Sequence, residues 1–444
     1  MHIAYVCADP GIPVFGTKGA SVHVQEVVRV LLEAGHTVEL FCRRTDGEPW
    51  PAAAAARAAG RLVVHELGRI RGTDVADRER RAMAADAELR QVMETAGPFD
   101  AVYERYSLWS TAGTGYARDH QVPAILEVNA PLPEEQARHR GLVHAAEAHA
   151  VIRRAAAAAS AVVCVSQPVA DWVRAELAAG TGTTAGTAHP SVVVESNGVD
   201  VTRVVPAPPA APAQRPFTVG FVGTLKPWHG TETLLEAHAL LRRAVPDARL
   251  LLVGDGPQAA ALRAQAEALG IADAVEMTGA VAPVDVPGHL HRMDVATAPY
   301  PAVGEGYFSP LKVYEYMAAG LPVVASAVGQ LPRVVDHRRT GFLVPGSDPA
   351  ALAEALRELA ADRRLRARVG AAAREHVVAG HTWTHVVARS LAAAGMLLSV
   401  PPVAAGESSA LGDSSALAEA GAAGGSAAGG TWAWGAGTGK GAVA

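Results

Sequence analysis

The chain has 444 residues; half of them are apolar and 19% are charged, with 39 Lys and Arg against 44 Asp and Glu. This length is sufficient for two or three domains that each bury a core. The near balance of charge argues against a chain that is disordered throughout and against a protein that binds nucleic acid by electrostatic attraction.

The first half of the chain alternates short apolar segments with longer helical patterns. The apolar segments are continuous, which is typical of strands in a parallel sheet that helices cover on both faces. The predicted strands are 3–7, 38–42, 101–104, 124–128 and 161–165. The predicted helices are 20–34, 78–95 and a single long helix over 134–159.

A proline-rich segment separates this half from a second alternating series. Asn197 and Gly198 predict a tight turn, and the prolines that follow predict a stiff, extended linker. Further strands are predicted at 217–223, 250–253, 275–278, 295–298 and 323–325, and helices at 349–359, 363–378 and 383–398. The fold class is therefore α/β: two doubly wound, Rossmann-like parallel-sheet domains, over 1–200 and 217–399, with a linker over 201–216. The last helix is free to pack back on the first domain.

From 400 to 444 the composition shifts to Ala, Gly and Ser, which predicts a disordered tail. Within it, Trp432 and Trp434 are either a docking handle or two exposed tryptophans. Three cysteines lie in apolar segments, as is typical of buried thiols in a reducing compartment: Cys7, Cys42 and Cys164. We find neither a signal-peptide pattern nor an apolar run long enough to span a bilayer, so we expect a cytoplasmic protein.

The most informative segment runs from Phe308 to Gly320. Ser309 is a favoured N-cap residue, followed by a proline that suits the first turn of a helix. The N–H groups of Leu311 and Lys312 would then open a helix N-terminus, where an anionic diphosphate is stabilised.

Glu315 lies one turn further along, on the same helix face as Leu311. Its carboxylate could therefore reach the hydroxyl groups of a bound ribose. The alternative is an ordinary capped helix in which Glu315 forms a salt bridge.

Three glycine-containing loops each follow a predicted strand. Gly16 and Gly19 in the first loop permit a ligand to approach the backbone closely, although the G-K-[ST] ending of a nucleotide-hydrolysing P-loop is missing. The second loop, 223–230, holds cationic residues in an anion-receptive position before a helix, and the third contains Gly254. The third loop lacks the full dinucleotide-binding glycine pattern, so a nicotinamide cofactor is not indicated. For the first loop the alternative is a flexible loop without a ligand, and for the second it is a plain strand–helix turn with a solvated lysine.

Taken together, these segments resemble the glycosyltransferase family 4 (group 1) enzymes of the GT-B architecture, in which two Rossmann-like domains face each other across a cleft. The resemblance covers about 1–395 and also rests on the segments 127–132 and 197–200. It implies a nucleotide-sugar donor bound mainly by the second domain, an acceptor bound mainly by the first, and retention of the anomeric configuration.

The resemblance also implies roles for particular residues. Glu315 matches the second glutamate of the family's E-x7-E signature, which binds the ribose, and Leu311 and Lys312 match the backbone positions that hold the diphosphate. The first glutamate is replaced by Tyr307, with Glu305 displaced by two residues.

The 223–230 loop departs from the family in a second way. After Gly223 the usual Arg and Lys are replaced by Thr224 and His229, which leaves Lys226 as the expected cation. The histidine that the family often places near the donor sugar has no clear counterpart, and that strand end carries Glu127 and Asn129 instead. Glu127 either orients the acceptor or the sugar, or is a salt-bridged strand-end carboxylate.

The implied reaction is the transfer of a sugar from a UDP-, GDP- or ADP-sugar to a hydroxyl group of a glycan, a lipid-linked saccharide or a small molecule. We expect Lys226, Glu127 and Asn129 to serve catalysis. No cofactor and no metal ion are expected, because the chain has no D-x-D triplet. The rival functions are a sugar-nucleotide epimerase and a nucleotide-sugar-binding protein with weakened turnover.

One local group of arginines between 69 and 81 is either a weak contact with anionic lipid at the inner face of the membrane or a solvated helix face.

Overall fold

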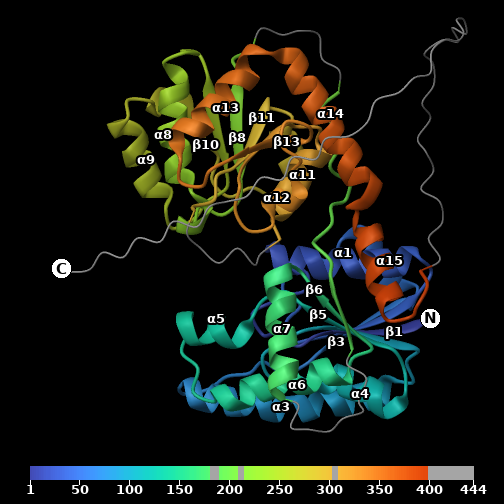
Figure 1. The fold of residues 1–444 in the computed structure, drawn as a ribbon. Coiled ribbons are helices and arrows are strands. Elements are labelled where there is room, and N and C mark those ends of the chain that lie inside the picture. Colours follow the sequence, from blue (N-terminus) through green and yellow to red (C-terminus); the bar gives the residue numbers. More distant parts are fainter. Residues whose placement is uncertain (181–189, 209–214, 303–308, 399–444) are drawn as a thin grey trace, which may run out of the picture. The chain divides into compact units, whose positions relative to one another are not determined.

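The computed structural model describes residues 1–180, 190–208, 215–302 and 309–398 (Figure 1). Tyr307 and Glu305 lie outside the described residues, as does the predicted tail over 400–444 with Trp432 and Trp434.

The first lobe is built on a parallel sheet of seven strands in the described part of the chain, in the order β3-β2-β1-β4-β5-β6-β7. Its strands are β1 (His2–Cys7), β2 (Thr37–Cys42), β3 (Leu62–Glu66), β4 (Ala101–Arg105), β5 (Ala124–Val128), β6 (Ala161–Cys164) and β7 (Ser191–Val194). Its helices are α1 (Gly19–Glu33), α2 (Pro51–Ala58), α3 (Val75–Ala96), α4 (Ala112–His120), α5 (Leu132–His139), α6 (Ala145–Ala158) and α7 (Gln167–Gly180).

Strand β1 shows why this sheet needs helices on both faces. Ile3 and Tyr5 belong to the same core as the apolar face of α1, whereas Ala4 and Val6 pack with residues of α3 and α4. Successive side chains of a strand point to opposite faces, so a continuous apolar run buries both of them. The expected two-sided, parallel arrangement is confirmed (Figure 1).

The second lobe repeats the plan with a parallel sheet of six strands, in the order β10-β9-β8-β11-β12-β13. Its strands are β8 (Thr218–Val222), β9 (Arg249–Val253), β10 (Val275–Met277), β11 (Val295–Ala298), β12 (Val323–Ser326) and β13 (Gly341–Val344). Its α-helices are α8 (Thr231–Arg242), α9 (Ala259–Ala268), α10 (Val286–Leu290), α11 (Leu311–Ala318), α12 (Leu331–Val334), α13 (Pro349–Ala361) and α14 (Arg363–Gly380), with short 3-10 turns η1 (Pro227–His229) and η2 (Ala272–Ala274).

The last described helix, α15 (Trp383–Ala393), packs against the first lobe. Trp383, Val387 and Leu391 lie in the same hydrophobic core as Val24 of α1. The chain therefore returns to its first sheet after it has completed the second one.

Two details of the sequence-based prediction are wrong. The predicted helix over 134–159 is two helices, α5 and α6, because Gly141 adopts a left-handed conformation with φ +81° between them. Strands β3, β7 and β13 were not predicted. Each is only four or five residues long and lies at an edge of its sheet, and so short an apolar run does not by itself distinguish a strand from other structure.

The strand orders locate the ligand-binding edge of each sheet. In both sheets the order reverses direction beside the first strand, between β1 and β4 in the first lobe and between β8 and β11 in the second. Ligands of doubly wound sheets bind at the carboxyl ends of the strands at such a switch point. No described helix combines the length and the hydropathy that a bilayer-spanning segment requires.

Candidate active site

The side chain of Lys312 lies at the switch point of the second sheet. Its ammonium nitrogen is 4.1 Å from the ring centre of Phe221 and 5.6 Å from that of Tyr300, the residues at the ends of β8 and just beyond β11. The nitrogen is shielded from solvent and has no hydrogen-bond partner among the described residues. Burial lowers the pKa of Lys312 to about 7, while the nearby Glu315 opposes that change. The site therefore holds a buried amine that an anion would satisfy.

Two glycines shape the space next to this amine. Gly223 has φ +148°, and a Cβ atom there would lie 2.8 Å from Lys312 Nζ. Gly254 has φ +135°, and a Cβ atom there would lie 2.1 Å from the carbonyl oxygen of Gly223. Only glycine fits at both positions, so the ends of β8 and β9 approach each other closely beside the amine.

The rest of the 223–230 loop supplies one cation and one neutral ring. His229 Nδ1 donates to the carbonyl of Thr224 at 2.5 Å, so Nε2 carries no proton in the neutral ring. Burial, followed by repulsion from Lys312, lowers the pKa of His229 to about 4. The ring is therefore neutral at pH 7, and Lys226, whose ammonium lies 5.3 Å from the ring centre of Trp228, is the charged group of the loop.

The start of α11 differs from the expectation. Ser309 does not cap the helix: Pro310 occupies the cap position, and the Ser309 hydroxyl accepts instead from the backbone N–H of Asn197 at 3.0 Å. The N–H of Leu311 donates to the carbonyl of Ser309 at 3.0 Å, so it is not free for a diphosphate. The proline restricts the turn before the helix, and the serine side chain is used to bind the segment that crosses between the lobes.

Glu315 is held by an arginine from that crossing segment. Its Oε1 lies 3.6 Å from Arg203 Nη2, and the same nitrogen lies 3.9 Å from Glu26 of α1. Burial raises the pKa of Glu315, and Arg203 opposes this rise. The carboxylate is therefore already paired on one side, as the salt-bridge alternative predicted, while about a quarter of its side chain (24%) stays exposed.

Glu127, at the end of β5, is buried and surrounded by donors. It accepts from Tyr103 Oη at 2.8 Å, from Arg105 Nη1 at 2.8 Å and from Asn129 Nδ2. Burial by itself would raise the pKa of Glu127, but His23 and then Arg105 outweigh it and lower the pKa to about 2. The structure thus brings Glu127 and Asn129 together, as a salt-bridged carboxylate and its donor.

His23 is a residue that the sequence analysis did not identify. Its Nε2 lies 2.8 Å from Glu127 Oε1, and its Nδ1 lies 2.8 Å from Asn197 Oδ1. Since Asn197 in turn donates to Ser309, a chain of polar contacts runs from the end of β5 to the start of α11. The only trace of this in the sequence is one histidine within the buried face of α1.

The first glycine loop also lies against the start of α11. A Cβ atom on Gly19 would be 3.5 Å from Leu311 Cδ1, an ordinary contact, whereas one on Gly16 would lie 2.8 Å from Pro13. The loop therefore joins the first lobe to the helix that carries Lys312 and Glu315.

A pocket of about 410 Å³ lies at the switch point of the first sheet. It is lined by residues that follow β1 and β4, by one side of α3 from Arg78 to Leu89, and by α5. A second pocket, of about 530 Å³, lies at the amino ends of β8, β9 and β10, which is the edge that doubly wound sheets do not use for ligands.

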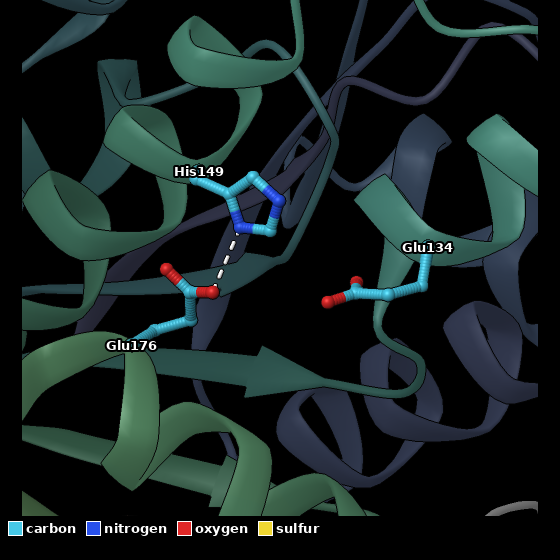
Figure 2. A group of neighbouring side chains, drawn as sticks. All are labelled: Glu134, His149 and Glu176. Carbon is cyan, nitrogen blue, oxygen red and sulfur yellow. Dashed lines mark hydrogen bonds and ion pairs between the residues drawn. The ribbon is translucent and has the colours of Figure 1, made fainter. Parts of the chain in front are cut away.

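One group of side chains within the described residues has the composition of a metal site (Figure 2). Glu134 of α5 points towards His149 of α6 and Glu176 of α7, and their ligand atoms lie within 4.8 Å of one another. Protein donors already engage both carboxylates: His149 and Arg153 contact Glu176 at 2.7 and 3.3 Å, and Trp172 donates to Glu134 at 2.7 Å. The group therefore ties α5, which lines the 410 Å³ pocket, to α6 and α7.

Comparison with protein-family models matches two parts of the chain. The model described as Glycosyltransferase Family 4 matches residues 17–180, and the model described as Glycosyl transferases group 1 matches residues 216–362. The two matches fall on the first and the second lobe, respectively.

Curated proteins give longer matches. The chain is 30% identical over 398 residues, or 81% of its length and 77% of the relative's, to a D-inositol 3-phosphate glycosyltransferase of Salinispora tropica. It is 36% identical over 203 residues to the GDP-mannose-dependent alpha-(1-6)-phosphatidylinositol monomannoside mannosyltransferase of Mycobacterium tuberculosis. That match covers 43% of this chain, which spans about half (52%) of the length of the mycobacterial relative.

Solved structures show the same fold. A sucrose-phosphate synthase of Thermosynechococcus elongatus superposes with a TM-score of 0.61 at 21% identity, over 87% of this chain and 96% of that one. HepE of Anabaena, solved in complex with UDP, has a TM-score of 0.61 at 18% identity, over 88% and 98% of the two chains.

Proposed function

Because this chain belongs to the glycosyltransferases of family 4 (group 1), we propose that it transfers a sugar from a nucleoside-diphosphate sugar to an acceptor hydroxyl, with retention of configuration and without a metal ion. GDP-mannose is the first donor to test, because the name of the mycobacterial relative specifies it. UDP- and ADP-sugars are the next donors to compare.

The buried, unpartnered ammonium of Lys312 is the observation that carries this proposal. It lies beside Gly223 at the switch point of the second sheet, where a diphosphate can approach the backbone. Binding there would give the amine a charged partner and favour its protonated form. In this assignment the side chains of Lys312 and of Lys226 in the 223–230 loop take the role that the sequence analysis gave to the backbone N–H groups of α11.

In the reaction, the bond between the anomeric carbon and the β-phosphate oxygen breaks, and a bond from the acceptor oxygen to the same carbon forms. Negative charge develops on the leaving diphosphate, and Lys312 and Lys226 stabilise it. The acceptor hydroxyl loses its proton to an oxygen of that diphosphate on the same face of the sugar. Glu127 is a poor alternative base, because its pKa is about 2 and protein donors occupy its oxygens.

Glu315 would bind the ribose hydroxyls with the exposed part of its carboxylate. Arg203 supports this role, because its positive charge opposes the rise in the pKa of Glu315 that burial causes. A carboxylate accepts hydrogen bonds from two neighbouring hydroxyls, whereas a protonated acid does so less well.

Glu127 acts in this proposal as a positioning residue. It fixes Asn129 and Arg105 at the edge of the first sheet and, through His23 and Asn197, couples that edge to the start of α11. The 410 Å³ pocket beside this edge is the proposed acceptor site.

The test is to incubate the purified protein with UDP-, GDP- and ADP-sugars and to measure both nucleoside-diphosphate release and the configuration of the product by NMR. Transfer should continue in the presence of EDTA, and the product should have the same anomeric configuration as the donor. An epimerised donor without nucleotide release would overturn the proposed transfer. A reaction that EDTA stops would overturn the proposed independence of a metal ion, and a product of inverted configuration would overturn the proposed retention.

A further inference from the structure

The carboxyl end of β4 carries a glutamic acid that solvent does not reach. Glu104 is 0% exposed, and it lies in register with Val6 of β1 and Leu126 of β5, which are apolar. Gly113 of α4 lies over the carboxyl group, because a Cβ atom there would be 2.7 Å from Glu104 Oε2. The acid is therefore buried between the first sheet and α4, at the switch point where the 410 Å³ pocket lies.

One serine hydroxyl contacts both this acid and a second one. Ser110 Oγ lies 2.9 Å from Asp86 Oδ1 and 3.1 Å from Glu104 Oε1. A serine hydroxyl carries one proton, so it donates to only one of the two carboxyl groups. Two ionised carboxylates would leave the other contact without a proton and hold two negative charges against one buried oxygen. One of the two acids therefore donates to Ser110.

The remaining contacts show which acid carries the proton. Asp86 also accepts from the backbone N–H of Thr111 at 3.0 Å, from the Thr111 hydroxyl at 3.0 Å and from the backbone N–H of Ala112 at 3.2 Å. The backbone N–H of Thr114 donates to Glu104 Oε2 at 2.7 Å, which leaves Oε1 to Ser110. Since three further donors stabilise a charge on Asp86, the protonated acid is Glu104, and the donation runs from Glu104 to Ser110 to Asp86.

The electrostatic surroundings of Glu104 agree with this assignment. Burial raises the pKa of Glu104 to about 7, the N–H of Thr114 opposes that rise, and the negative charge of Asp86 adds to it. Glu104 is therefore largely protonated below pH 7 and ionised above it.

The other charged side chains near this pair are bound elsewhere. Arg43, directly after β2, pairs with Glu88 at 2.8 Å, and Arg90 of α3 pairs with Glu94 at 2.6 Å and with Asp119 at 3.1 Å. The charged residues of α4, 118–120, occupy its last turn, whereas Glu104 contacts its first turn. An ionised Glu104 would thus face the charge of Asp86 without a compensating cation from these described elements.

Ser110 belongs to a loop that forms a wall of the pocket. The loop 106–111 joins β4 to α4, and four of its residues line the 410 Å³ pocket: Ser107, Leu108, Trp109 and Ser110. Asp86 lines the same pocket from α3. The hydrogen bonds of Asp86 and Glu104 hold the loop where it enters α4, so the position of this wall depends on the proton of Glu104.

We propose that Glu104 is a positioning residue for the acceptor: as the protonated acid it donates to Ser110 and holds the loop 106–111 against the acceptor pocket, and its ionisation releases that loop. This inference rests on the proposed function, which places the acceptor in this pocket. Glu104 itself touches neither substrate.

The first test is the pH profile of KM for the acceptor, with the donor that the protein cleaves at saturation. The acceptor to use is D-inositol 3-phosphate, which the name of the Salinispora relative specifies. In the parent, KM should rise about tenfold between pH 6 and pH 8.5, with little change in kcat, because the hydrogen bond from Glu104 is lost.

Three variants assign this profile to the pair. Glu104→Gln still donates to Ser110 and accepts from Thr114 but cannot ionise, so its KM should stay low at both pH values. Ser110→Ala should have the high KM at both. Glu267→Gln, on the surface of α9, should follow the parent. All other titrating groups, Lys312 included, are common to the parent and Glu104→Gln, so the difference between their profiles belongs to Glu104.

A second readout needs neither donor nor acceptor. The fluorescence of Trp109, taken as the difference between the parent and Trp109→Phe, should change with a midpoint at about pH 7 as the loop moves. The change should be missing when the same difference is measured in the Glu104→Gln and in the Ser110→Ala background.

Trp109 fluorescence that does not change between pH 6 and pH 8.5, or a Glu104→Gln variant that keeps the pH dependence of the parent, would overturn the inference and leave the proposed function intact. Failure to cleave any sugar nucleotide would instead overturn the proposed function. The fluorescence titration would still decide whether ionisation of Glu104 moves the loop.

Discussion

His23 Nε2 lies 2.8 Å from Glu127 Oε1, which places a histidine of the first helix against the carboxylate at the end of β5. Arg105 and Tyr103 hold the same carboxylate from other directions. Glu127 is thus the centre of a buried polar cluster that fixes the edge of the first sheet.

The first prediction concerns the contribution of Glu127 to stability. Its folded pKa of about 2 lies below the ordinary value of 4.5, so the carboxylate stabilises the fold above pH 4.5, and this contribution is lost as the pH falls towards 2. The difference corresponds to about 3 kcal/mol at neutral pH. Glu127→Gln should lower the free energy of unfolding in urea by about that amount, because Arg105 is left without its anion.

The exposed Glu267, for which the described residues provide no side-chain partner, offers a control: Glu267→Gln should change stability by less than about 0.5 kcal/mol. The difference in the free energy of unfolding between the parent and Glu127→Gln should become smaller below pH 4.5. A difference that becomes larger in acid would contradict a lowered pKa for Glu127.

The second prediction separates ligand binding from stability at Lys312. Lys312→Met replaces a buried, unpartnered amine by an apolar side chain of similar length. The free energy of unfolding should therefore stay the same or rise by about 1 kcal/mol. Affinity for GDP or UDP should fall about 10- to 100-fold, because the charged contact to the diphosphate is lost. Calorimetric titration and urea unfolding of the same preparations measure both effects, with Arg263→Gln on the surface of α9 as the control.

The third prediction is a pH dependence that follows from Lys312. Free protein loses the proton at about pH 7, and a bound diphosphate favours the charged form, so nucleotide affinity is full below pH 7 and declines as the pH rises through it. Lys312→Met should lack this decline. If the parent binds GDP equally well at pH 6 and pH 9, Lys312 does not contact the diphosphate.

The fourth prediction concerns Glu315. Glu315→Ala should weaken nucleotide binding by about 1–3 kcal/mol, since hydrogen bonds to the ribose are lost. The parent should prefer a ribonucleotide over its 2′-deoxy analogue, and the variant should show little preference. Equal discrimination in both proteins would mean that Glu315 serves only its ion pair with Arg203.

The fifth prediction tests the close approach of β8 to the amine. Gly223→Ala places a methyl group 2.8 Å from Lys312 Nζ at φ +148°, so both stability and nucleotide affinity should fall. Gly288→Ala has no atom within 4 Å of the new methyl group and should be neutral. Thermal unfolding with and without GDP compares the two variants.

The sequence determined the architecture because its signals are local. Continuous apolar strands between amphipathic helices can bury both sides only in a covered parallel sheet, so the two Rossmann-like sheets and the loops at their switch points could be predicted. The segment Ser309–Gly320 was likewise predicted correctly to contain a helix, which is α11. A motif that depends only on residues close together in the chain can be predicted from the sequence.

The tertiary structure decided how the side chains of those elements are used. Ser309 has the chemistry of a helix cap, yet its hydroxyl binds Asn197, which is 112 positions away. His23 resembled an ordinary core residue until the fold placed it against Glu127, and Arg203 reached Glu315 in the same way. Burial and ion pairing depend on contacts between distant segments, and these contacts leave no periodic or local pattern in the sequence.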